Sequence, residues 1–403
     1  TIIRFLLPGV IPEHFTEAAD AVRVVGSMLP LAGISAVLST ALASSGKQRV
    51  PILARALPAL AVGLAVFLIK ISNLATLPLA LLVGTAARFG ILLMALLSAK
   101  ISFKRPRPLW KGGRVLLIFI GLPLIVFVLR NLHIVTERVL ASTALGSSGT
   151  VVSIVLAFLP LTPFLGMVGS VTTIVLLPFI MRSGLAGGKE QIARLMSLGL
   201  QLTLALSVPT TAFLLTFKSE ITEVLYGWGA IRVEQQVIIC SLLARYAPGI
   251  VALAVLPVLL RVMQITRSVL FQMSTAVGGF IVTFGLQWIL LCRYGHQGIP
   301  TGTVLGAYLL GGFLFIFLIV DLGRESHRDI PGFLGALLFS SVISAWVASK
   351  VFEWLFGWME LLWFPLISAG FIFSAGFCII LAALTWSRIM NLMSAVMGKT
   401  PVD

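Results

Sequence analysis

Long runs of apolar residues, separated by short polar connectors, occupy most of the chain from residue 22 to residue 388. The runs lack the alternation of apolar and polar residues that a half-buried strand requires. About 20 apolar residues, each rising about 1.5 Å, are enough for a helix to cross a bilayer. The pattern therefore predicts eleven membrane-spanning helices, at residues 22–45, 51–71, 75–98, 114–135, 149–181, 192–217, 236–262, 268–292, 299–320, 333–356 and 361–388.

Proline and glycine interrupt several of these runs. Pro160 and Pro163 lie within the 149–181 run, which we expect to form one long, kinked helix rather than two short ones. Similar breaks occur in the stretches LPLAGIS, ALPALAVG, LSVPTT and YAPGIVALAVLP. Helices that bend around a central site are typical of transporters, although each single proline is also compatible with a tolerated kink.

Composition supports a membrane protein, and the residue types present argue against an enzyme. The 403 residues are 59% hydrophobic and 11% charged, with a mean hydropathy of +1.08, whereas soluble domains have about 45–50% apolar and about 25% charged residues. The three cysteines lie in or beside apolar runs, as packing residues do. No zinc-protease spacing, carboxylate pair on one helix face or phosphate-binding glycine loop occurs in the sequence. We therefore expect a protein that is not an enzyme and that has no cofactor or metal.

The net charge of +15 is divided unevenly between the two sets of connectors. Connectors on one side hold seventeen Lys and Arg against five acids, and those on the other side hold eight against nine. Because cytoplasmic loops are enriched in Lys and Arg, the basic side and the C-terminus are predicted to be cytoplasmic. With this orientation, the abrupt start at Thr1 implies that an odd number of helices precedes the first residue.

The connector at residues 99–113 is strongly basic and contains no acid. Anionic leaflets attract such segments, so we predict that it lies on the cytoplasmic surface and contacts anionic lipids rather than nucleic acid. The predicted lipid contacts are Lys104, Arg105, Arg107, Lys111 and Arg114.

Some arginines are predicted to lie inside the spans. Arg88 is near the middle of the 75–98 run and Arg245 is about ten residues into the 236–262 run. A charge at such depth costs about 2.5–3.5 kcal/mol and should face a cavity. Because Arg binds phosphate through paired hydrogen bonds, we expect Arg88 and Arg245 to bind an anionic substrate, with pairing to backbone carbonyls as the alternative. Arg55 joins this set, although its place near a helix start equally fits snorkelling to the surface.

Glu137 is the candidate for coupling transport to an ion or a proton. It is predicted at the outer end of the helix at 114–135, beside Arg138. An interfacial ion pair between these two residues is the simpler interpretation, and coupling is the alternative.

Five stretches in order along residues 1–320 resemble the MurJ/MviN family of lipid II flippases, within the multidrug/oligosaccharidyl-lipid/polysaccharide exporter superfamily. The stretches are LLPGVIPEHF, STALASSGKQRVPILARALPAL, TERVLASTALGSSGTVVSIVLAF, VLLPFIMRSGLAGGKEQIARLMSLGLQL and LYGWGAIRVEQQ. The resemblance implies an all-α, two-lobed, polytopic membrane helix bundle of fourteen spans, with eleven present here and three preceding residue 1. It divides the chain into a truncated first lobe (1–98), the basic connector (99–113), a second lobe of six spans (114–328) and two C-terminal spans with a cytoplasmic tail (329–403).

The same resemblance implies a function. Such a protein is a monomer in the bacterial inner membrane that moves a polyprenyl-diphosphate-linked saccharide by alternating access, with lipid II for peptidoglycan synthesis as the favoured cargo. Many members have a cavity arginine where this sequence has Gln201, so Gln201 joins the candidate substrate contacts. A flippase for exopolysaccharide or O-antigen units is the alternative. A drug/cation antiporter would need an intramembrane carboxylate, and a membrane scaffold for envelope synthesis would need no cavity.

Overall fold

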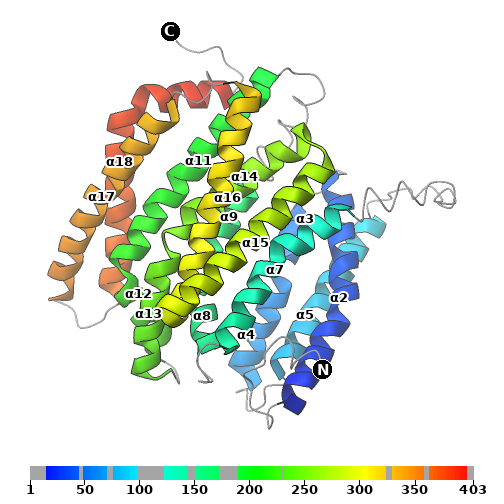
Figure 1. Ribbon diagram of the computed structural model, residues 1–403. Coiled ribbons are helices and arrows are strands. Elements are labelled where there is room, and N and C mark those ends of the chain that lie inside the picture. Colours follow the sequence, from blue (N-terminus) through cyan, green and yellow to red (C-terminus); the bar gives the residue numbers. More distant parts are fainter. Residues whose placement is uncertain are drawn as a thin grey trace. The chain divides into compact units, whose positions relative to one another are not determined.

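The computed structural model describes nine stretches of the chain, and their regular structure is entirely helical (Figure 1). This confirms the predicted all-α class. The chain divides into two compact units, Thr1–Gly113 and Arg114–Asp403. The stretches that the structure describes are residues 15–44, 49–69, 76–98, 122–143, 150–171, 189–228, 231–323, 329–357 and 363–396.

The first unit contains α2 (Phe15–Ser44), α3 (Arg49–Ala54), α4 (Leu57–Ile69) and α5 (Thr76–Ser98). α5 packs against both α2 and α4. Its close approach to α4 depends on Gly84, since a Cβ there would lie 2.6 Å from the Cα of a proline in α4. The buried apolar core of this unit consists of Leu38, Leu42, Ala54, Leu92 and Leu96.

The span predicted at 51–71 contains two helices in the structure, and they are separated just before the proline of the stretch ALPALAVG, where a break was expected. A turn at Arg55 and Ala56 separates α3 from α4. Pro58 has no N–H to donate to the carbonyl of Ala54, and its ring would clash with that carbonyl in a continuous helix. Proline is tolerated in the first turn of a helix, which is where α4 places it.

The second unit contains all the remaining described helices. α17 and α18 pack side by side, and α17 runs along α11 (Figure 1). Two buried apolar clusters lie toward opposite ends of α11, one including Met196 and Leu200 and the other Leu214. The helices are α7 (Leu122–Thr143), α8 (Thr150–Phe158), η4 (Leu159–Leu161), α9 (Thr162–Val171), α11 (Lys189–Thr216), α12 (Lys218–Tyr226), α13 (Val233–Tyr246), α14 (Gly249–Thr266), α15 (Val269–Tyr294), η6 (Gly295–Gln297), α16 (Gly298–Leu322), α17 (Asp329–Phe356) and α18 (Trp363–Val396).

α15 and α16 pack closely against each other along their length. The turn between them begins at Gly295, whose φ of 60° is a conformation that glycine adopts at low cost. A Cβ on Gly302 would lie 2.6 Å from the Cα of Gln287, and a Cβ on Gly306 would lie 2.4 Å from Oγ1 of Thr283. These two glycines therefore allow the backbones to approach, as small residues do between membrane helices.

Two further predicted helices are interrupted at proline, as the sequence led us to expect. The segment predicted at 236–262 is α13 followed by α14, with a bend of 45° between them at Ala247 and Pro248. In the segment predicted at 149–181, α8 leads directly into α9 through the 3-10 turn η4, which contains Pro160. This agrees with the expected single, kinked helix, and residues 172–181 lie outside the described residues. A proline removes one helical hydrogen bond, which explains both interruptions.

Six helical segments among the described residues are long and apolar enough to cross a membrane, or seven if α13 and α14 form one bent span. One of the six, Leu270–Leu322, contains both α15 and α16. Many large apolar side chains on these helices are exposed, as expected where helices face lipid. The segments support a multi-pass membrane protein, but the count of eleven spans, like the four-part division of the chain, stays a prediction.

Candidate functional site

A cluster of buried polar side chains lies between α7, α13, α15 and α16. The phenol of Tyr246 donates a hydrogen bond to Oε1 of Glu137. Thr303 Oγ1 donates to the same oxygen at 3.1 Å, and Gln287 Nε2 donates to Thr303 Oγ1 at 2.9 Å. All four residues are buried. The cluster therefore links four helices. The carboxylate of α7 is bonded directly to side chains of α13 and α16, and α15 is joined through its bond to Thr303.

Glu137 is buried inside the second unit. It lies within α7, which continues to Thr143, and not at the end of the helix. Its hydrogen bonds come from Tyr246 and Thr303, whereas the side chain of Arg138 is exposed. The expected interfacial ion pair is therefore wrong. The helix extends beyond the predicted end at residue 135 because Glu, Arg, Val and Leu follow, and these residues are compatible with a helix.

The cluster places one acidic side chain among neutral hydrogen-bonding groups. A buried carboxylate is costly unless hydrogen bonds or a positive charge offset the loss of hydration. Oε1 of Gln287 is buried and has no hydrogen-bond partner among the described residues. That oxygen is a further acceptor close to the carboxylate. Within the described residues, no group of three or more His, Cys, Asp and Glu side chains could hold a metal ion.

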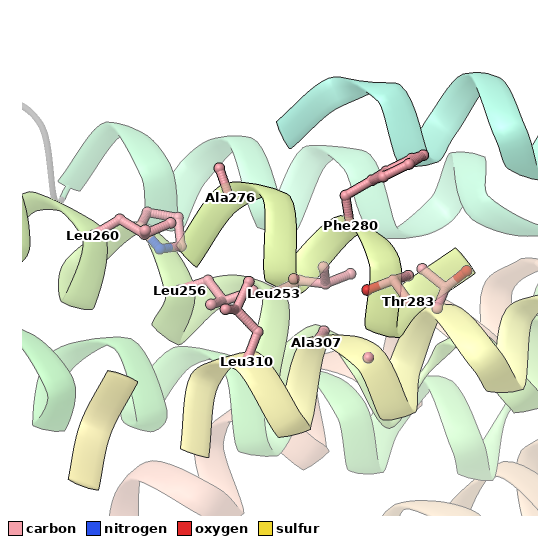
Figure 2. Close-up of a pocket in the computed structure, with 12 residues that line it drawn as sticks. Leu253, Leu256, Leu260, Ala276, Phe280, Thr283, Ala307 and Leu310 are labelled. Carbon is pink, nitrogen blue, oxygen red and sulfur yellow. The ribbon is translucent and has the colours of Figure 1, made fainter. Parts of the chain in front are cut away.

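A cavity of about 170 Å³ borders the cluster, between α14, α15 and α16 (Figure 2). Leu253, Leu256 and Leu260 of α14 line one side, and Figure 2 shows them facing side chains of α15 and α16. Thr283 and Thr303 supply the hydroxyl groups of an otherwise apolar wall. Because Thr303 also binds Glu137, the cavity wall and the polar cluster are continuous.

Arg88 lies midway along α5 in the first unit and is half-buried. Its Nε atom is buried without a hydrogen-bond partner among the described residues. An unsatisfied buried donor costs about 1–3 kcal/mol. An anionic ligand could remove that cost by accepting a hydrogen bond from Nε.

Arg245 occupies a different place from the one expected. It lies in the last turn of α13, next to the bend, and its side chain is exposed. Nη2 donates to Oε1 of Gln297 in η6 at 3.4 Å. The helix α13 ends one residue after Arg245 instead of continuing through it, and the role of Arg245 in binding a substrate stays a prediction.

The other two candidate substrate contacts, Arg55 and Gln201, lie on other elements. Arg55 is exposed in the turn between α3 and α4, and Gln201 is half-buried in the middle of α11. Arg55 and Arg88 belong to the first unit, and Arg245 and Gln201 belong to the second. No hydrogen bond joins any two of these four described residues. The predicted lipid contacts Lys104, Arg105, Arg107, Lys111 and Arg114 lie outside the described residues.

Tyr246, Thr303 and Gln287 were not predicted as partners of Glu137. A usable signal was present for Gln287, because it interrupts the apolar stretch GLQWILL. Polar groups within membrane helices are costly, so they usually face a partner. Tyr246 and Thr303 gave no such signal, since both are common at helix ends.

Comparison with known proteins relates the sequence of this chain to one family. The family model described as lipid II flippase MurJ matches residues 1–369. A lipid II flippase MurJ from Burkholderia cenocepacia is 24% identical over 187 residues, which are 45% of this chain and 36% of that protein. A probable lipid II flippase MurJ from Rhizobium meliloti is 26% identical over 277 residues, 67% of this chain and 49% of that protein. The chain thus spans about half, or less, of the length of these curated relatives.

A solved structure shows the same fold. It is lipid II flippase MurJ in an inward closed conformation, and its TM-score with this chain is 0.74 at 16% sequence identity. The match covers 96% of this chain and 78% of the solved chain.

Proposed function

This chain belongs to the lipid II flippase MurJ family, and we propose that it moves a polyprenyl-diphosphate-linked saccharide, with lipid II as the favoured cargo, across the bacterial inner membrane. The observation that carries the proposal is the family match over residues 1–369. The similar fold of a MurJ in an inward closed conformation supports an alternating-access cycle. Moving the cargo between leaflets requires no covalent step, so the proposed protein is a transporter and not an enzyme.

Arg88 is the residue that we propose binds the diphosphate. Its Nε is buried and unpartnered among the described residues, and a guanidinium can offer paired hydrogen bonds to phosphate oxygens. Arg245, Arg55 and Gln201 are proposed as further contacts along the path. The exposed side chains of Arg245 and Arg55 suit contact with the headgroup near a membrane surface.

The polyprenyl tail is proposed to remain in lipid, along the last two helices. An apolar groove of about 540 Å³ between α9, α11 and α18 supports this path. Phe164, Phe213, Phe371 and Phe377 contribute to its lining. Burying an isoprenoid against such a surface gains about 25 cal/mol for each Å² of apolar area.

Glu137 is proposed to couple transport to a proton or a monovalent cation. Its burial and its contacts with Tyr246 and Thr303 support this role. A change in the charge of Glu137 would alter the contacts that hold α7, α13 and α16 together. Moving one net charge through the membrane field is worth about 2.3 kcal/mol per 100 mV, so the membrane potential could drive the cycle.

The proposed orientation places the C-terminus and the basic connector in the cytoplasm. The excess of Lys and Arg on that side supports the assignment. Lys104, Arg105, Arg107, Lys111 and Arg114 are then positioned to bind anionic lipids, and the protein is proposed to act as a monomer.

A flippase for exopolysaccharide or O-antigen units is the second candidate. The uncharged, half-buried Gln201 favours it, because a neutral side chain there suits a head group that differs from that of lipid II. A non-transporting scaffold would give no role to the unpartnered Nε of Arg88.

Complementation tests the proposed cargo. The gene that encodes this chain should restore growth to bacteria depleted of their own lipid II flippase. Arg88→Glu should abolish the rescue, and Arg88→Lys should retain part of it. Failure of the unaltered gene, with rescue of a strain lacking an O-antigen flippase, would replace lipid II by the second candidate.

A further inference from the structure

A polar hollow lies between α12 and α13, away from the Glu137 cluster and from the apolar groove. Its volume is about 680 Å³. The lining combines one cation, one acid, several hydroxyl groups, an amide and a thiol. The residues are Lys218, Ser219, Thr222, Glu223, Gly227, Val233, Gln236, Val237, Cys240 and Ser241.

The hollow lies at a membrane surface. α11 has 28 residues, so it is about 42 Å long at a rise of about 1.5 Å per residue. This exceeds the hydrocarbon thickness of about 30 Å. α12, which begins at Lys218, therefore lies at the surface opposite to the Lys189 end of α11.

The walls of the hollow are held firmly. Ile221, Thr222 and Tyr226 form the buried face of α12, and the Tyr226 hydroxyl donates to the carbonyl of Leu156 at 2.7 Å. Gln236 Nε2 donates to the carbonyls of Tyr226 and Ile231 at 3.3 and 3.1 Å. The spacing between the two walls is thus fixed before any ligand binds.

The two charges of the hollow, Lys218 and Glu223, have no ion-pair partner among the described residues. Both side chains are exposed. By contrast, Lys350 and Glu353, three residues apart on α17, form an ion pair of 2.7 Å. One cation and one acid that share a hollow without pairing are complementary to a ligand that carries both charges.

Exposed apolar side chains accompany the charges: Val233 and Val237 line the hollow, and Leu225 and Trp228 are close in sequence to its lining residues Glu223 and Gly227. We call these four apolar residues the rim. Leu225, Trp228, Val233 and Val237 are each more than half exposed, and Trp228 is 81% exposed. Tryptophan is enriched at the boundary between headgroups and acyl chains. A ligand that combines a zwitterionic head with apolar chains would contact the charges and the rim together.

We propose that the hollow between α12 and α13 binds one phospholipid with a phosphoethanolamine headgroup. Lys218 binds the phosphate, and the carboxylate of Glu223 accepts hydrogen bonds from the ammonium group. The acyl chains lie against the rim of Leu225, Trp228, Val233 and Val237. A phosphocholine head has no N–H to donate to Glu223, and a phosphoglycerol head has no cation, so both should bind more weakly.

Cys240 lines the hollow and reports on its occupancy. A variant with Cys292→Ala and Cys378→Ala leaves Cys240 as the single thiol. It is placed in bilayers of phosphatidylcholine, with or without phosphatidylethanolamine or phosphatidylglycerol, and the rate of reaction with a maleimide is measured. Phosphatidylethanolamine should slow the reaction by about tenfold, as for a ligand at about ten times its Kd.

Lys218→Ala and Glu223→Gln should each remove this protection, and the matched control Lys350→Ala should keep it. Native mass spectrometry should detect one phosphatidylethanolamine on the unaltered protein and none on the two variants. The proposal is overturned if phosphatidylglycerol protects Cys240 equally, if protection survives in both variants, or if the lipid is retained by all variants alike. These outcomes are independent of which saccharide the protein transports.

Discussion

The phenol of Tyr246 and the carboxylate of Glu137 form a buried hydrogen bond that joins α13 to α7 across 109 positions of the chain. The bond is made by the last residue of α13, next to the 45° bend that leads into α14. Thr303 of α16 binds the same carboxylate oxygen. A change in the protonation or ligation of Glu137 would therefore be transmitted to the junction between α13 and α14.

The substitution Glu137→Gln tests the coupling role. Glutamine keeps an oxygen that can accept from Tyr246 and Thr303 but removes the charge. Transport should fall by about tenfold or more, which corresponds to about 1.4 kcal/mol in the barrier, and should lose its response to membrane potential. The measurement is the rate at which lipid-linked saccharide reaches the outer leaflet. Glu234→Gln, at an exposed position in the first turn of α13, is the control, and unchanged transport by Glu137→Gln would exclude coupling through this acid.

Tyr246→Phe tests the structural value of the hydrogen bond. The ring of Tyr246 packs edge-on against Phe158, with 5.2 Å between centroids, and phenylalanine preserves that contact. Loss of this donor leaves the buried carboxylate with the hydrogen bond from Thr303 and should lower the free energy of unfolding by about 1–3 kcal/mol, the range for hydrogen bonds to charged groups. Thermal unfolding in detergent measures the change.

Tyr308→Phe is the matched control for Tyr246→Phe. The Tyr308 hydroxyl donates to the backbone carbonyl of Pro248 at 2.8 Å. This acceptor is uncharged, and hydrogen bonds to neutral groups contribute less than those to charged groups. The control should therefore change stability by less than Tyr246→Phe. Equal losses for the two variants would contradict a special role for the bond to Glu137.

Gly302→Ala tests the close contact between α15 and α16. The added Cβ would lie 2.6 Å from the backbone Cα of Gln287, which cannot move without shifting α15. Overpacking of this kind costs about 1–3 kcal/mol. On the same helix, Gly312→Ala meets nothing within 4 Å and should be neutral or slightly stabilising. Similar melting temperatures for the two variants would show that the helices separate easily at Gly302.

Asp321→Asn tests an ionic contact between three helices of the second unit. One oxygen of Asp321 lies 2.8 Å from Nη2 of Arg267 and 3.2 Å from Nζ of Lys189. Asp321 is only 16% exposed, so its loss should cost more than the roughly 0.2–1 kcal/mol of an exposed pair. Glu353→Gln, which breaks the exposed pair with Lys350, is the control. Chemical unfolding at low and high salt should separate the two variants, and identical midpoints would contradict the prediction.

Hydropathy predicted the helical class because a membrane helix must be apolar along most of its length. It did not predict where helices bend. The runs around Pro58 and Pro248 are apolar on both sides of the break, so their hydropathy does not change where the backbone turns. The position of Arg245 along its helix differs for the same reason, since it was counted along one continuous helix, whereas α13 ends at Tyr246.

The polar cluster could be predicted only in part. Glu137 was singled out because acids are rare near the spans, but its partners come from three other helices. Tyr246, Gln287 and Thr303 are brought together by packing between helices that are distant in sequence. Hydropathy carries no information on which helices become neighbours. Arg88 could be singled out from the sequence alone, because a charge midway along an apolar run is costly wherever that run packs.

The most direct test of the proposed function is the access of lipid II to the outer leaflet. Cells depleted of their own flippase would carry the gene that encodes this chain, or its Arg88→Glu variant. A membrane-impermeant enzyme that cleaves lipid II would be added outside, and the cleaved fraction measured. The proposal predicts extensive cleavage with the unaltered gene and protection with Arg88→Glu. Lipid II that stays protected although the unaltered protein is present in the membrane would contradict it.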